Sequence, residues 1–336
     1  MSADVPTLTV VASWCNHPEL IKLHKELWCR AFPGETVRYV AYIDGAQPVE
    51  GKQSENTNSF QIWKLCQEAN IQCVLVPEQF HQKRALLFPQ TKYYSSSAPS
   101  FRNAVVCQYA WMKETSGGTR HLIFTQSDIF PFREQTCDAF MGGDRIFSYR
   151  HQHRVSDDGE AILEYAWEGL CGFDLSKWSP TMIAAMSFEA GFCVGVNKDS
   201  SSLLPPKFIF GDTGAGSSLV LRAIPAHLKR EWTEHGSGRW SHTDDDLPPL
   251  PDWLQRFIRL DPRGAGAGLP SYSEIFDDWC FHLRGGSDYE KADTSMLQLR
   301  FSLFQAFVYE AWKNDTLVLS NLKQTEIPTP EDDGQG

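Results

Sequence analysis

Apolar, β-rich runs alternate with segments of helical spacing through the first 130 residues, and this alternation limits the fold more than any other feature. Strands are expected at residues 8–12, 37–43, 73–76 and 122–124. Helices are expected from Asn16, around residues 60–66 and from Ser100, with a loop at residues 78–94. Parallel strands need crossover connections, and these are right-handed. The alternation therefore predicts an α/β fold with a mostly parallel, Rossmann-like central sheet and helices on both faces.

The rest of the chain is less regular in pattern. It offers a short strand at residues 146–149, a Gly-rich turn at 211–214, a Pro-rich stretch at 246–253 and a helix near 294–312. We expect the Pro-rich stretch to form an ordered loop or a lid. Because no internal repeat or long linker divides the chain, residues 1–322 are expected to form one domain, followed by a disordered tail at residues 323–336.

Charge and composition exclude several classes of protein. The chain carries 42 Asp+Glu against 31 Lys+Arg, for a formal net charge of −11. Phosphate backbones need a basic surface, so nucleic acid is not expected as a partner. No run of 18 or more apolar residues occurs, so no transmembrane segment is expected. The nine Cys form no CxxC pair and the N-terminus has no basic signal-peptide region, which favours a cytoplasmic protein.

Polar side chains collect where the expected strands end. The first strand runs into Ser13, the second ends at Asp44 and the fourth ends at Asp128. In open α/β sheets, ligands bind beyond the carboxyl ends of the strands, so these side chains are expected at one ligand-binding edge. Neither GxGxxG nor GxxxxGK[ST] occurs in the chain, which argues against a dinucleotide-binding dehydrogenase and against a P-loop enzyme.

Four parts of the chain resemble the GT-A fold of nucleotide-sugar glycosyltransferases: residues 10–19, Asp44, residues 100–104 and residues 121–132. The resemblance implies that residues 1–135 bind a nucleotide-sugar donor (a UDP- or GDP-sugar). It also implies that residues 136–322 bind a glycan or another hydroxyl acceptor. The donor contacts that it implies are Ser13, Asp44, Arg102, Asn103 and Ser127. The implied activity is transfer of the sugar, as in a hexosyltransferase.

The metal-binding motif of that family is incomplete in this chain. The family has an acidic residue at both ends of a three-residue motif, whereas this chain has Gln126-Ser127-Asp128. The resemblance implies a Mn²⁺ or Mg²⁺ ion at Asp128, completed by a late histidine, His282. Carboxylate and phosphate oxygens suit both ions, and a neutral imidazole also binds Mn²⁺.

The residues after His282 suit a diphosphate. Arg284 offers a planar fork for phosphate, and two glycines let backbone N–H groups approach an anion. The expected set is Arg284, Gly285, Gly286 and Ser287. The alternative is an ordinary surface turn that carries a basic residue.

The second half supplies the candidates for the acceptor side. Asp212, in the Gly-flanked turn, is the first candidate for a catalytic base and Glu189 the second, although turns also collect Asp for structural reasons. Trp167, Glu168 and Trp253 are expected to line the acceptor cleft. For the first two the alternative is a core strand with a glycine bulge. An inverting enzyme needs the base and a retaining enzyme does not, and both remain open.

Two other functions are compatible with the same residues. The missing acid at Gln126 would suit a protein that binds a nucleotide or a glycan without turnover. A hydrolase or a nucleotidyltransferase would share the donor pocket and would direct the reaction to water or to a different acceptor.

Overall fold

The computed structural model describes residues 6–46, 58–87, 99–198, 207–236, 250–262, 273–283 and 294–313. Its central sheet has the strand order β11-β6-β7-β4-β1-β2-β3. Four strands run parallel: β1 (Leu8–Trp14), β2 (Val37–Asp44), β3 (Gln72–Val76) and β4 (His121–Gln126). The antiparallel strand β7 (Ala161–Asp174) pairs with β4 and with β6 (Phe147–Val155), and β11 (Lys229–Glu231) lies beside β6. The predicted α/β class and mostly parallel sheet are confirmed.

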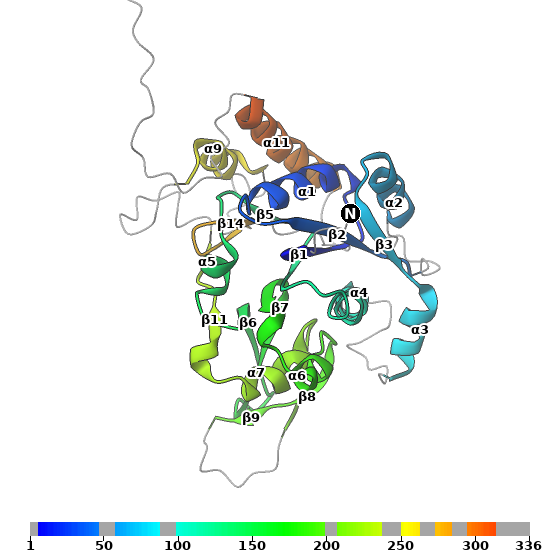
Figure 1. Cartoon of the computed structure of the whole chain (residues 1–336), viewed down its shortest axis with the longest axis vertical. Coiled ribbons are helices and arrows are strands. Elements are labelled where there is room, and N and C mark those ends of the chain that lie inside the picture. Colours follow the sequence, from blue (N-terminus) through cyan, green and yellow to red (C-terminus); the bar gives the residue numbers. More distant parts are fainter. Residues whose placement is uncertain are drawn as a thin grey trace, which may run out of the picture.

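Helices cover both faces of this sheet (Figure 1). One layer holds α1 (Ile21–Arg30), α2 (Ser59–Glu68), α9 (Asp252–Leu260) and α11 (Thr294–Lys313). The other holds α4 (Pro99–Glu114), α6 (Pro180–Ala185) and α7 (Ser218–Ala223). In β1, Val10 and Ala12 pack in the first layer, whereas Val11 packs in the second, as the two-residue period of a strand requires. Because each face buries its own apolar cluster, the central strands read as continuous apolar runs.

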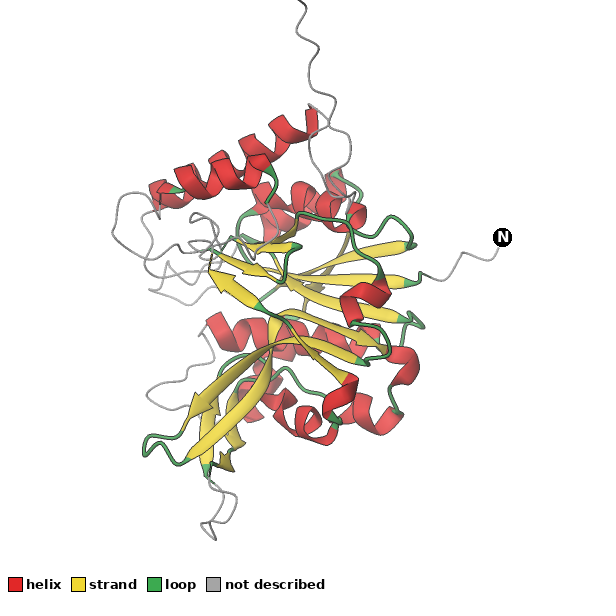
Figure 2. Cartoon of the chain, turned by 90° about the vertical axis from the view of Figure 1, so that its left-hand side faces the viewer, coloured by secondary structure: helices red, strands yellow, loops and turns green. Residues whose placement is uncertain are grey.

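A small antiparallel sheet joins the C-terminal part of the chain to β5, which follows β4 of the central sheet. Figure 2 shows the strands in yellow with red helices on either side. Its strands are β12 (Glu234–Gly236), β13 (Glu274–Phe276), β14 (Cys280–His282) and β5 (Ile129–Pro131). The remaining strands are β8 (Gly191–Val194), β9 (Val196–Asn197) and β10 (Phe208–Gly211). The remaining helices are η1 (Pro18–Leu20), α3 (Glu78–Leu87), α5 (Cys137–Met141), η3 (Leu175–Lys177), η4 (Ala215–Ser217) and η5 (Ala226–Leu228). Within the described ranges, no helix combines the length and the apolar character needed to cross a bilayer.

Three segments differ from the prediction. The loop expected at residues 78–94 contains the helix α3, because residues 78–87 hold no Gly or Pro and include strong helix formers. The strand expected at residues 146–149 is longer and continues to Val155. Trp253, expected in a Pro-rich loop, lies in α9, which begins directly after Pro251. Residues 246–249 and the tail at 323–336 lie outside the described residues, and the single domain stays a prediction.

Arg300 of α11 joins three segments of the C-terminal part. Its guanidinium is fully buried, and Nε donates to Asp261 Oδ1 at 2.9 Å. Nη1 donates to the carbonyl of Leu283 at 2.6 Å, and Nη2 donates to Ser273 Oγ at 2.8 Å. Asp261 follows α9, Ser273 precedes β13 and Leu283 follows β14. One side chain therefore ties α11 to α9 and to the hairpin that carries His282.

We predict that Arg300→Met lowers the free energy of unfolding by about 3–5 kcal/mol, since it leaves the buried Asp261 carboxylate without its counter-charge. Urea denaturation measures this loss. The control is Arg256→Met, which removes the ion pair of Arg256 with Glu310 between the same two helices (3.2 Å, with the side chains 46% and 50% exposed). Such an exposed pair contributes about 1 kcal/mol or less. Equal losses in the two variants would contradict the anchoring role of Arg300.

Candidate active site

The pairing of β14 with β5 brings Asp128 and His282 together. Asp128 lies between β4 and β5, and the register of the pair sets His282 opposite Ile129. The N–H of Leu283 donates to the carbonyl of Asp128 at 2.8 Å, which continues the pairing. As a result His282 Nε2 lies 3.5 Å from Asp128 Oδ2. Two residues that are far apart in sequence, and that the resemblance singled out, thus meet at the carboxyl edge of the sheet.

The Asp128 carboxylate is 1% exposed, and neither of its oxygens has a hydrogen-bond partner within the described part of the chain. Burial opposes its ionisation, but the nearby His282 and His17 outweigh this effect and lower its pKa. A buried carboxylate without donors is costly unless a cation or a ligand compensates it. The geometry therefore marks this carboxylate as a place where a cation adds stability.

A line of alternating charges extends behind His282. Its Nδ1 lies 2.7 Å from Glu274 Oε2, and Arg150 Nη2 lies 3.6 Å from Glu274 Oε1. Burial works against the imidazolium, but Asp128 and Glu274 together raise the pKa of His282 to about 9. The Arg150 guanidinium lies over the Trp167 ring at 4.6 Å, and this ring is also 5.2 Å from the His282 ring. Arg150, Glu274 and Trp167 thus fix the orientation of the histidine.

These residues fit a divalent cation as a partial ligand set. Asp128 offers a hard oxygen, and His282 Nε2 would offer a second ligand once a cation displaces its proton. Glu274 holds Nδ1, an arrangement common behind metal-binding histidines. In the described ranges no group of three or more His, Cys, Asp or Glu side chains is arranged to hold a metal ion. Further ligands would have to come from a substrate, as is usual for Mg²⁺ beside phosphates.

A buried histidine holds the main chain of the motif. His24 of α1 is fully buried, with Nε2 2.9 Å from the carbonyl of Gln126 and Nδ1 2.8 Å from the Tyr39 hydroxyl. A carbonyl only accepts, so Nε2 carries the proton and Nδ1 accepts from Tyr39. Trp14 Nε1 donates to the same hydroxyl at 3.2 Å. This chain of hydrogen bonds fixes the end of β4, where the motif begins.

Glu168 is the second buried carboxylate of the site. Its Oε1 accepts from Asn103 Nδ2 of α4 at 2.8 Å and from Gln126 Nε2 of β4 at 2.9 Å. Its Oε2 is buried and has no hydrogen-bond partner in the described ranges. Burial raises the pKa of Glu168 to about 8, and the negative charge of Asp212 acts in the same direction, against the two amide donors. The side-chain amide of Gln126 on β4 is therefore hydrogen-bonded to the Glu168 carboxylate on the neighbouring strand β7.

A β-bulge places Glu168 in this position. Tyr149 of β6 pairs with Cys171 of β7, and the next residue, Arg150, pairs with Trp167. Residues 168–170 are therefore extra on the β7 side and have no partner on β6. Bulges of this kind re-aim side chains and are frequent next to active sites. The sequence left open a core strand with a glycine bulge as the alternative for Trp167 and Glu168. The backbone of β7 has such a bulge, and the bulge also places Glu168 at the candidate site.

The turn that carries Asp212 is packed against β7. Gly214 has φ +92°, and a Cβ at this position would lie 2.2 Å from the carbonyl of Ala166 and 3.5 Å from Glu168 Oε2. Only glycine allows both this backbone conformation and this approach. The Asp212 side chain is 39% exposed, with Oδ1 accepting from the N–H of Thr213 at 2.8 Å and Oδ2 3.7 Å from Arg154 Nη2. The turn therefore faces the free oxygen of Glu168.

Asp44 is paired inside the protein. Its Oδ2 accepts from Arg102 Nε at 2.7 Å, and its Oδ1 accepts from the N–H of Ala46 at 2.9 Å and lies 3.3 Å from His81 Nε2. The carboxylate is 2% exposed. Asp44 and Arg102 were predicted to contact the donor separately, whereas the structure makes them one buried ion pair. Their contact with a nucleotide stays a prediction.

The remaining predicted residues are distributed as follows. Ser13 lies beside Gln126 in the β1–β4 register, and Ser127 is buried next to Asp128. The expected second base, Glu189, forms an ion pair with Arg84 of α3, which favours a structural role. Residues 284–287 lie outside the described residues.

Two of the predicted acceptor residues lie among other side chains. Trp253 is 4% exposed and packs 5.9 Å from the Phe304 ring of α11, which makes it a core residue instead of a cleft residue. Trp167 is 8% exposed, and Arg150 covers its ring. These contacts favour supporting roles for both rings over stacking on a sugar.

Three residues of the site were missed by sequence reasoning. His24 reads as an ordinary helix residue, and Arg150 and Glu274 stand in short segments without a motif. Glu274 precedes His282 by eight positions, and only the β13–β14 hairpin places the two opposite each other. No local pattern in the sequence gives this information.

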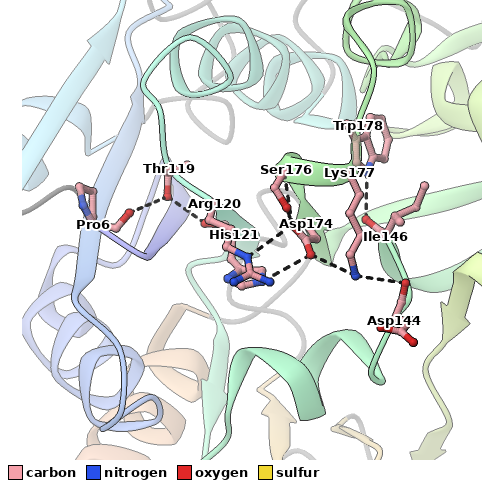
Figure 3. Close-up of polar contacts among 10 residues, drawn as sticks. All are labelled: Pro6, Thr119, Arg120, His121, Asp144, Ile146, Asp174, Ser176, Lys177 and Trp178. Atoms are coloured by element: carbon pink, nitrogen blue, oxygen red, sulfur yellow. Dashed lines mark hydrogen bonds and ion pairs between the residues drawn. The ribbon is translucent and has the colours of Figure 1, made fainter.

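The other end of β4 carries a polar cluster of a different kind (Figure 3). Asp174 Oδ2 lies 3.3 Å from Lys177 Nζ and 3.9 Å from His121 Nε2, and Oδ1 accepts from the hydroxyl and the N–H of Ser176. Both oxygens therefore have partners, which indicates a structural cluster. A cavity of 530 Å³ with a mostly apolar lining lies nearby between α6 and α7, and Lys177 is one of its lining residues.

No family model matches the chain, and no curated protein matches it. Solved structures do match, and they are glycosyltransferases, as the resemblance suggested. A galactosyltransferase, LgtC, in complex with donor and acceptor sugar analogues matches at 15% identity over 51% of this chain and 59% of its own, with a TM-score of 0.29. The bifunctional glycosyltransferase WbbM matches at 11% identity over 55% of this chain and 34% of its own, with a TM-score of 0.33.

The mannosyltransferase PcManGT from Pyrobaculum calidifontis, in complex with GDP-Man and Mn²⁺, matches at 10% identity. The match covers 50% of this chain and 44% of that one, with a TM-score of 0.26. This chain thus spans less than two thirds of the structures that it matches. At such TM-scores the likeness carries no argument about activity, which therefore rests on the geometry of the site.

We predict that His24 makes stability fall with decreasing pH. Complete burial lowers its pKa to about 3, so the folded chain keeps the neutral ring where the unfolded chain binds a proton, below about pH 6.5. Its contribution is therefore present above pH 6.5 and is lost as pH falls toward 3. Between pH 7 and pH 5 this loss is about 2 kcal/mol. His24→Gln does not titrate, so its free energy of unfolding should lose about 2 kcal/mol less over this range; parallel curves would contradict the assignment.

Proposed function

We propose that the chain transfers a sugar from a nucleoside-diphosphate sugar to a hydroxyl acceptor. The observation that carries this proposal is the buried Asp128 carboxylate, which faces His282 and accepts no hydrogen bond from any described residue. It lies at the same edge of the sheet as the Asp44–Arg102 pair and as Glu168. This edge is where an open α/β sheet binds its ligand. A charged, phosphate-bearing ligand suits it, because such a ligand brings a cation to the orphaned carboxylate.

Asp128 and His282 would hold a Mn²⁺ or Mg²⁺ ion, and the chemistry that it supplies when bound is neutralisation of charge on the leaving diphosphate. His24 keeps the motif backbone in place, and Glu274 keeps the His282 ring oriented. The predicted diphosphate contacts from Arg284, Gly285, Gly286 and Ser287 are part of this proposal. So are the predicted contacts from Asp44 and Ser13 with the nucleoside.

The acceptor side of the proposal lies between β7 and the turn of Asp212. Here Glu168 Oε2 and the Asp212 carboxylate are the acidic groups that face the edge of the sheet. In a single displacement, the acceptor oxygen bonds to the anomeric carbon while the bond from that carbon to the diphosphate breaks. The acceptor proton passes to a base.

Nucleotide sugars separate this function from its rivals. The protein is incubated with UDP-glucose, UDP-galactose or GDP-mannose, with Mn²⁺ or with EDTA, and the products are identified. Transfer to an added sugar supports the proposal, and loss of transfer in EDTA supports the metal. Binding without turnover would instead support the binding protein. Nucleotide-sugar breakdown or synthesis without transfer would support the hydrolase or nucleotidyltransferase.

We predict that Asp128→Asn and His282→Ala each weaken Mn²⁺ binding in the presence of UDP at least tenfold, since each removes one of two protein ligands. Isothermal titration calorimetry measures the affinity. Asp174→Asn is the matched control, because Asp174 is as deeply buried but lies at the other end of β4. Its Mn²⁺ affinity should stay within twofold of wild type. Unchanged affinity in both site variants would exclude a cation shared by Asp128 and His282.

A further inference from the structure

We propose that Glu168, and not Asp212, takes the proton of the acceptor hydroxyl, and that the amides of Asn103 and Gln126 orient it for this task. This inference rests on the proposed function. It starts from the two oxygens of Glu168, which differ in their surroundings. Oε1 accepts both amide hydrogen bonds, whereas Oε2 is buried and has no hydrogen-bond partner among the residues that the structure describes. Two donors on one oxygen fix the carboxylate plane and leave the other oxygen for a substrate.

The free oxygen faces the segment that is expected to bind the acceptor. A Cβ added to Gly214 would lie 3.5 Å from Glu168 Oε2, so the turn of residues 211–214 passes next to this atom. A buried oxygen that accepts no hydrogen bond costs free energy. The hydroxyl group of a bound substrate would recover this free energy by donating a hydrogen bond to Oε2. The bulge in β7 that places Glu168 here also interrupts the hydrogen-bonded pairing of β7 with β6. This interruption costs stability, and a functional role of Glu168 would explain why it is kept.

This arrangement also explains why position 126 is Gln. Gln126 Nε2 lies 2.9 Å from Glu168 Oε1. An acidic residue at this position would place two carboxylates in contact, and one of them would have to hold a proton. The neutral amide instead donates a hydrogen bond to the ionised form of Glu168. Gln126, where the family motif has an acidic residue, and Glu168 on the neighbouring strand β7 therefore act as a hydrogen-bonded pair.

Asp212 suits the role less well. Its side chain is 39% exposed, its Oδ1 accepts from the N–H of Thr213, and its Oδ2 faces Arg154 at 3.7 Å. Both of its oxygens thus have partners, whereas Glu168 Oε2 accepts no hydrogen bond from the described residues. The other titratable groups that interact with Glu168 from adjacent elements are Cys107 of α4 and Cys171 and Tyr165 of β7. Burial raises the pKa of each, so Asp212 is the charged group that acts on Glu168.

The step balances as a single displacement. The acceptor O–H bond breaks and its proton moves to Glu168 Oε2. The acceptor oxygen forms the bond to the anomeric carbon, and the nucleoside diphosphate leaves with the electron pair of the broken bond. Glu168 then returns the proton to solvent, so no further reactant is consumed.

The first test is Glu168→Gln, which keeps the shape of the side chain and its two amide contacts. Turnover of the best sugar donor from the panel should fall roughly 10²- to 10⁴-fold, with the dissociation constant of that donor within twofold of wild type. Glu164→Gln is the matched control, because Glu164 lies on the same strand and its side chain is 53% exposed. It should keep wild-type turnover. Wild-type turnover in a folded Glu168→Gln variant would overturn the inference.

The second test keeps Glu168 in place and reads the pH profile of kcat/KM. Gln126→Met removes a donor that favours the ionised carboxylate, so the acidic limb of the profile should move about one unit to higher pH. Asp212→Asn removes a negative charge that acts on Glu168, so the limb should persist and move to lower pH. Opposite shifts support Glu168 as the base. Loss of turnover and of the acidic limb in Asp212→Asn would identify Asp212 as the base and overturn the inference.

Failure of the inference differs from failure of the proposed function. If the wild-type protein transfers sugar and the Glu168→Gln variant does so equally well, only the assignment of Glu168 as the base is wrong. If the wild-type protein transfers no sugar from any donor of the panel to an added acceptor, the proposed function is wrong, and the inference fails with it.

Discussion

The candidate site depends on the antiparallel pairing of β5 with β14. Each strand has only three residues, yet their register sets His282 opposite Ile129 and closes the N–H of Leu283 onto the carbonyl of Asp128. The parallel sheet alone would leave Asp128 as a buried carboxylate at the end of a strand. Backbone hydrogen bonds, which hold atoms to within a few tenths of an ångström, convert two distant residues into a pair.

The buried carboxylates of the protein fall into two kinds. Asp44, Asp174 and Asp261 have donors or cations on both oxygens, and they tie segments together. Asp128 and Glu168 keep at least one oxygen without a hydrogen bond in the described part of the chain. Natural proteins satisfy nearly all buried polar atoms, so the exceptions need an explanation. Glu189 Oε1 also lacks a hydrogen bond there, but it is ion-paired with Arg84. Asp128 and Glu168 both lie at the carboxyl edge of the sheet, where a ligand could satisfy them.

Local sequence patterns predicted the parallel strands, the helices between them and the position of Asp128, because burial on both faces leaves continuous apolar runs. The approach of His282 to Asp128 was suggested only by the resemblance to a family. The role of Asp44 was harder to predict, because Asp44 ends the strand β2, its partner Arg102 lies on the helix α4, and no spacing in the sequence links them. Glu168 was singled out as an acceptor contact, but its hydrogen bonds to Asn103 and Gln126 result from a bulge in strand pairing. Hydrophobic periodicity carries no signal for such a bulge.

The anchoring of α11 has a consequence for the order in which the protein becomes competent during synthesis. The parallel strands β1 to β4 are complete once residue 126 has left the ribosome, and their mutual pairing involves no later segment. The hairpin that carries His282 receives its last support only from Arg300, near the end of the described chain. A nascent or truncated chain would therefore have a folded sheet and an incomplete site. Competence would therefore arise only after residue 300 has been synthesised and Arg300 has bound its partners.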